Sequence, residues 1–246
     1  MPADLTVLDA VALLAFLAIW LIYNLLFDGW LRRPNSINAK MIALRKGWMI
    51  RLLKRDNRIV DATLIQISIR SATFFASTTI LVVAGLIGVI SAAETVHSAT
   101  VNLSMLLRGT SQALFETKVF LLISIFVYAF FKFTWAIRQY TYFSSIIGSA
   151  PDYEGGPVDQ DMAGRMALIL SHAVWQLNAG IRAYYFALAA LGWFIHPIFF
   201  ITMTVLMTFV LVRRQLYSAT AKGISEHVAA LALDTGQERR GRASAE

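Results

Sequence analysis

The sequence contains no cysteine, which excludes disulfide bonds, thiolate metal sites and cysteine nucleophiles together. Charged residues are also scarce: Asp, Glu, Lys and Arg make up 15% of the chain, whereas hydrophobic residues make up 57%. This balance lies well outside the usage of soluble domains. The composition therefore predicts an all-α, polytopic integral membrane protein.

Local signatures of enzymes and cofactor sites are also missing. The chain has no HExxH motif and no pair of histidines four residues apart, so a metal site is poorly supported. It has no Gly-x-Ser-x-Gly motif, no phosphate-binding P-loop and no dinucleotide-binding glycine pattern. We expect neither a metal nor a cofactor, and we interpret the protein as non-enzymatic.

Positive charge is concentrated in one block. Residues 28–70 carry ten Lys or Arg against three Asp, a net charge of +7 that equals the formal charge of the whole chain. Basic segments beside membrane spans face the cytoplasm. The block therefore predicts a multi-pass protein of the inner membrane with its N-terminus outside and its C-terminus in the cytoplasm. Its counter-charge is expected to be anionic lipid headgroups rather than nucleic acid.

Apolar runs predict five membrane spans, at residues 10–27, 71–93, 119–135, 180–195 and 198–212. The fourth begins within an uninterrupted helical pattern from Met162 to Ile195, and His196 and Pro197 form a tight turn before the fifth. The alternative is four spans, with one kinked helix from 183 to 212. Residues 1–217 form the membrane domain, and residues 218–246 form a cytoplasmic tail that is partly disordered.

A second kind of helix is predicted at residues 37–56. Met41, Ile42, Trp48, Met49 and Leu52 share one side of this helix, although Arg45 intrudes on it. Such a helix suits either the membrane interface or a cytoplasmic position against its own protein. We expect its basic side to contact the lipid surface through Lys40, Lys46, Arg51, Lys54, Arg55 and Arg58.

Small residues recur at every fourth position of the second predicted span. Ala84, Gly88 and Ala92 make a ribbon along which another helix can approach closely. We expect this ribbon to pack within the chain, and the alternative is an interface between subunits of a homo-oligomer or a membrane complex.

Polar residues on the helix from Met162 offer the best candidate for a polar path or a headgroup contact. Asp161, Arg165, His172 and Gln176 fall within a narrow arc. Asn178 and Arg182 follow nearer the membrane, where Arg182 needs a partner or must snorkel to the headgroups. Asp61 is one such partner. A polar stripe is also what any helix that leaves the membrane shows to water.

Several segments in order carry a family resemblance. They are Arg58 to Asp61, Phe74 to Leu81, Val127 to Trp135, Asn178 to Ala190 and the pair His196-Pro197. With them the chain resembles the integral membrane proteins of the domain of unknown function 599 over most of residues 7–217. The resemblance implies a bacterial inner-membrane helical protein with relatives in plants, and it implies no activity.

Two functions follow from these observations. The first is an accessory, scaffold or assembly protein that acts by helix association. The second is a small transporter, channel or lipid-binding protein for an anionic solute or headgroup, with Arg182, Asn178 and His172 along its path.

Overall fold

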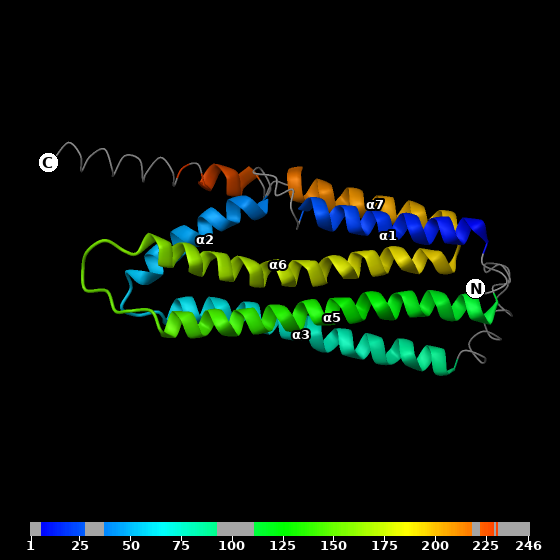
Figure 1. Cartoon of the computed structure of the whole chain (residues 1–246), viewed down its shortest axis with the longest axis horizontal. Coiled ribbons are helices and arrows are strands. Elements are labelled where there is room, and N and C mark those ends of the chain that lie inside the picture. The colour runs from blue at the N-terminus through cyan, green and yellow to red at the C-terminus, as the bar shows by residue number, and fades with distance from the viewer. Residues whose placement is uncertain (1–5, 28–36, 93–110, 218–221, 229, 231–246) are drawn as a thin grey trace.

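The chain forms an elongated helical bundle, which confirms the predicted all-α fold (Figure 1). The computed structural model describes residues 6–27, 37–92, 111–217, 222–228 and 230. Its elements in order are α1 (Val7–Phe27), α2 (Ile37–Leu53), α3 (Ile59–Ser91), α5 (Gln112–Gly148), α6 (Gln160–Leu191), the 3-10 turn η1 (Gly192–Phe194) and α7 (Pro197–Tyr217).

Helix α6 lies at the centre of the bundle. It packs against α5 on one side and against α7 and α2 on the other, and α3 packs on the far side of α5. Consecutive long helices α3, α5, α6 and α7 run in alternating directions (Figure 1). Because α3 packs on α5 and α1 packs on α7, α3 forms one edge of the bundle and the pair α1 and α7 forms the opposite edge.

The bundle has two halves that contain different numbers of helices, because its helices differ in length. Helices α1 and α7 have 21 residues each, about 32 Å, whereas α3, α5 and α6 have 33, 37 and 32 residues. All start or end near η1, so the three longer helices project beyond α1 and α7 at the other end (Figure 1). We call the projecting part, with α2 and residues 59–70, 136–148 and 160–176, the α2 half, and the remainder the η1 half.

Each half has its own hydrophobic core. In the η1 half the core is built around Phe16, Phe133, Phe186 and Trp193. In the α2 half α2 closes a second core that includes Met49.

Among the residues that the structure describes, four helices are long and apolar enough to cross a membrane: α1, α3, α5 and α7. The chain is thus a multi-pass membrane protein by the composition of its helices. Two of them are longer than the predicted spans 71–93 and 119–135. Helix α3 already starts at Ile59, whose amide donates to Asn57 Oδ1 (3.0 Å), and α5 runs from Gln112 to Gly148. Apolar length alone understates these helices, because charged residues, Arg70 in α3 and Lys118 and Arg138 in α5, bound the apolar run inside a longer helix.

Helix α6 and the turn after it agree closely with the helical pattern seen in the sequence. Asp159 caps α6 by accepting hydrogen bonds from the amides of Asp161 (2.8 Å) and Met162 (2.9 Å). The chain reverses at residues 195 and 196, and Pro197 is the first residue of α7. Residues 183–212 are therefore two antiparallel helices and not one kinked helix. Of the predicted tail, residues 222–228 are helical, and most of it lies outside the described residues.

Candidate functional site

A buried carboxylate links α2 to the start of α3. Asp61 has no exposed surface, and its Oδ1 accepts hydrogen bonds from Trp48 Nε1 (2.6 Å) and from the Arg55 guanidinium (2.7 Å). Its Oδ2 is buried without a hydrogen-bond partner. Asp61 therefore pairs with the α2 segment and does not serve as the partner of Arg182 that the sequence suggested.

The apolar side of α2 faces the protein. Met49 and Leu52 are fully buried in the core of the α2 half, so the structure takes the second of the two predicted alternatives, a helix packed on its own protein. Helix α2 ends at Leu53 and not at 56. Arg45, which seemed misplaced on the apolar side, donates to Ser171 Oγ on α6 (3.0 Å), and burial lowers its pKa.

The six basic residues predicted to contact lipid are not equivalent. Lys46, Arg51 and Lys54 are exposed. By contrast, Lys40 donates to Ser225 Oγ (2.5 Å), Arg55 pairs with Asp61, and Arg58 donates to the carbonyls of Ala150 and Pro151 (2.7 and 2.5 Å). Only the first three carry their charge at the surface without a hydrogen bond to the described part of the chain.

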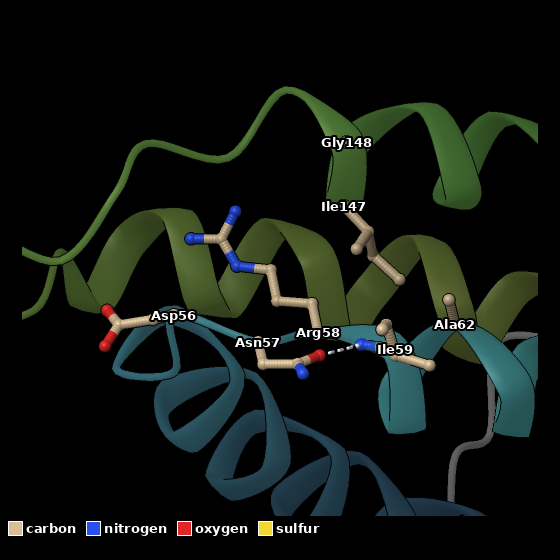
Figure 2. Close-up of a pocket in the computed structure, with 7 residues that line it drawn as sticks. All are labelled: Asp56, Asn57, Arg58, Ile59, Ala62, Ile147 and Gly148. Carbon is tan, nitrogen blue, oxygen red and sulfur yellow. Dashed lines mark hydrogen bonds between the residues drawn. The ribbon is translucent and has the colours of Figure 1, made fainter.

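A cavity of about 450 Å³ lies where α3 begins and α5 ends. Figure 2 shows its apolar side, formed by Ile59, Ala62 and Ile147, and its polar rim. In the rim Asn57 caps Ile59, Arg58 reaches toward the chain after α5, and Asp56 points away. Since these polar groups do not converge on one point, the cavity offers no catalytic arrangement. A second cavity, of about 240 Å³, is lined by residues 151–159 with Leu53 and Met162.

The polar stripe predicted on α6 faces outward over most of its length. Asp161, Arg165 and His172 are exposed, and Arg165 lies 3.7 Å from the Asp159 carboxylate. Gln176 is half-buried, with its Oε1 enclosed and without a hydrogen-bond partner. None of the stripe residues lines either cavity. The stripe has the geometry of a helix face turned to water.

Arg182 lies inside the bundle. The residue is 6% exposed, and its guanidinium lies 5.9 Å from the ring of Tyr23 on α1. The Tyr23 hydroxyl in turn donates to Gln215 on α7 (3.1 Å). Arg182 therefore does not snorkel outward but faces the ends of α1 and α7, while Asn178, one turn away, is half-buried.

Two further buried charges, Asp9 and Lys118, meet the same tryptophan near η1. Asp9 accepts a hydrogen bond from Trp193 Nε1 (2.8 Å), and Lys118 Nζ lies 5.7 Å from the centre of the same indole ring. Asp9 and Lys118 are 4% and 6% exposed. These contacts join α1, α5 and η1. The only sequence signal for them was the charge itself, because a buried charge at the edge of an apolar run needs a partner.

The small residues of α3 do not pack within the described chain. Ala84, Gly88 and Ala92 are exposed, and a Cβ added to Gly88 would meet nothing within 4 Å. The expected intramolecular packing is thus wrong. The last residue of α3 buried against the bundle is Thr79, so the helix leaves the bundle before the ribbon begins. Figure 1 shows this end of α3 diverging from α5.

No metal-binding cluster is formed in the part of the chain that the structure describes. Three or more His, Asp or Glu side chains do not gather there in a way that could hold a metal ion. A family model described as protein of unknown function DUF599 matches residues 11–220. The chain belongs to the DUF599 family. No curated protein and no solved structure matches this DUF599 protein.

Proposed function

We propose that this DUF599 protein is a non-enzymatic accessory or scaffold protein of the bacterial inner membrane that acts by helix association. The observation that carries the proposal is the outward face of α3. Ile59, Val60, Leu64 and Ile67 are 47–70% exposed in the α2 half, beyond the ends of α1 and α7. If the lipid tails surround the length of α1 and α7, about 32 Å, this part of α3 would lie in water, where exposed apolar clusters mark sites of association.

The proposed topology has five crossings. Helix α5 ends in the α2 half and α7 begins in the η1 half, so α6 has to cross the same layer to connect them (Figure 1). Helix α6 is less apolar than α5 and α7, which its central position allows because other helices shield its polar residues. The positive-inside rule then places the basic α2 half in the cytoplasm and the N-terminus outside.

This orientation also assigns a role to the exposed bases of α2. With its apolar side occupied by the protein, α2 would meet an anionic membrane surface through Lys46, Arg51 and Lys54. The attraction would be electrostatic and would fall with rising salt concentration.

Photo-cross-linking in intact cells tests the association. A photoreactive amino acid at Phe74, an outward residue of α3, should give a discrete protein adduct. The neighbouring Thr73 is also exposed and serves as the control, because it points about 100° away around the helix. Adducts to lipid alone from both positions would contradict the proposal.

One observation favours the second function, an anionic-ligand transporter or lipid-binding protein. Arg182 places a positive charge in the bundle where α1 and α7 end. On this alternative, replacing Arg182 with Leu abolishes flux or headgroup binding in reconstituted vesicles. Against it, Asp161, Arg165 and His172 face outward and do not lead to Arg182.

A further inference from the structure

The exposed apolar residues of α3 follow a heptad pattern. Alternate steps of four and three residues along the sequence lead from Val60 to Ala92. Every residue on this line is either apolar, or small and uncharged. All of these positions are exposed except Thr78, which is half-buried. We call this line the α3 seam. Two helices whose contact residues have this seven-residue spacing can pair as a left-handed coiled coil.

We propose that the α3 seam binds the α3 seam of a second copy of this chain, so that the protein forms a parallel homodimer. This inference rests on the proposed function and names its partner. Two copies inserted in one membrane share an orientation, so a two-fold axis along the membrane normal makes the two α3 helices parallel. Each seam residue then faces its own counterpart.

The chemistry of the seam suits such self-pairing. Leu64, Ile67, Phe74 and Leu81 supply apolar contacts along the inner two-thirds of the helix. The polar Ser71 is compatible with a dry interface, because its hydroxyl already donates to the carbonyl of Ile67 in its own helix (3.1 Å).

The outer third of the seam allows close approach of the two backbones. Gly85 and Gly88 each have open space where a Cβ would lie, and Ala92 is exposed. In a membrane, where burial of apolar surface provides no driving force, close contact of small residues is a main source of helix association. Helix α3 also leaves its own bundle in this region, which gives a second α3 room to pack (Figure 1).

Charge does not oppose the pair. Arg70 is the exposed charged residue of α3 between Val60 and Ala92, and it flanks the seam. In a parallel pair the two Arg70 side chains lie on opposite sides of the interface. Asp61 is on the bundle side of α3 and already pairs with Arg55. The two bundles likewise lie on opposite sides of the pair, because the buried residues of α3 lie on another face of the helix, about 100–160° around it from the adjacent seam residue.

The available area reaches the lower bound for a biological interface. A helix of 33 residues is about 50 Å long, and an apolar stripe of about 100° on a cylinder about 11 Å wide is about 10 Å across. The stripe therefore offers about 500 Å² on each copy, or about 1,000 Å² for the pair, which is the lower bound for a biological interface.

Single cysteines test the proposal directly, since the full-length chain contains none. In oxidised native membranes Ile67→Cys and Leu81→Cys should form disulfide-linked dimers, because facing seam positions bring their Cα atoms within disulfide range. Gln66→Cys and Ile80→Cys are controls at the same depth, exposed but off the seam, and should give at least about tenfold less dimer. Adding Leu64→Lys to Leu81→Cys should abolish the dimer without disturbing the fold, since Leu64 is exposed.

Two outcomes separate this inference from the proposed function. If Phe74 gives a photo-adduct with a different protein and no seam cysteine cross-links, the partner is not a second copy, and the inference is overturned while the proposed function stands. If there is neither a photo-adduct nor a cysteine dimer, both are overturned. Equal cross-linking of seam and control positions would mean random collision and would also reject the α3 seam as the interface.

Discussion

Gly180 is the position at which the bundle tolerates a side chain least. A Cβ added there would lie 2.4 Å from Cε1 and 2.7 Å from Cζ of Phe133 on α5. Ordinary contact between carbon atoms is about 3.5–4.0 Å, so the Phe133 ring would have to retreat by more than about 1 Å. Phe133 is fully buried and stacked on Phe75, with ring centres 5.3 Å apart, which leaves it little room to move.

The expected effect follows from two opposing terms. Overpacking a dense core costs about 1–3 kcal/mol. Replacing glycine by alanine inside a helix contributes about 1 kcal/mol in the other direction. Because the clash at Gly180 is severe, we expect Gly180→Ala to lower the free energy of unfolding by about 1–2 kcal/mol. Gly164 lies on the same helix with nothing within 4 Å of its added Cβ, so Gly164→Ala should raise it by about 1 kcal/mol.

Unfolding of the purified protein in mixed micelles by titration with sodium dodecyl sulfate, followed by circular dichroism, measures both variants. The two transitions should shift in opposite directions from that of the unaltered protein. If Gly180→Ala proves as stable as Gly164→Ala, then α5 and α6 do not approach one another as described, and the central packing of α6 is wrong.

Three further predictions concern the α2 half. Asp61→Ala should cost about 1–3 kcal/mol, because it leaves the half-buried Trp48 indole N–H unpaired and removes an ion pair with a partly exposed Arg55. Asp56→Ala, at an exposed position, should be near neutral in the same unfolding titration. The amide of Met162 holds the pKa of Asp159 below its usual range, so the first turn of α6 should stay capped above about pH 4 and open as the pH falls further. Hydrogen exchange of the amides in this turn, measured against pH, checks the expectation. If Asp159→Asn shows the same pH dependence of exchange, Asp159 is not the group responsible. The triple substitution Lys46→Gln, Arg51→Gln and Lys54→Gln removes the exposed bases of α2. At low salt it should weaken binding to anionic vesicles and leave binding to neutral vesicles unchanged. If the variant binds anionic vesicles as tightly as the unaltered protein, these bases have no role at the membrane surface.

Periodicity and composition predicted the architecture well, because they report directly on helices and apolar length. The uninterrupted pattern from Met162 gave the central helix, and the pair His196-Pro197 gave the reversal before α7. The bounds of α3 and α5 were less accessible. Charged residues, Arg70 in α3 and Arg138 in α5, bound the apolar runs and so made each predicted span shorter than its helix.

Burial was the part that the sequence could not supply. The amphipathic pattern of α2 is the same whether its apolar side meets lipid or protein, and only the core around Met49 decides between them. A ribbon of small residues likewise indicates a close approach without saying of which helix, and Ala84 is exposed where packing was expected. The pairs of Asp61 with Trp48 and of Asp9 with Trp193 join residues 13 and 184 positions apart, which local spacing cannot reveal.

The central claim is association through α3, and the mass of the native particle tests it most directly. The protein, expressed at its natural level, would be extracted with its lipids into copolymer discs and its protein mass measured by native mass spectrometry. We predict particles with two copies of the 27.4 kDa chain, and single copies after Leu64→Lys. A particle with one chain and no other protein, in both the unaltered and the substituted form, would contradict the account.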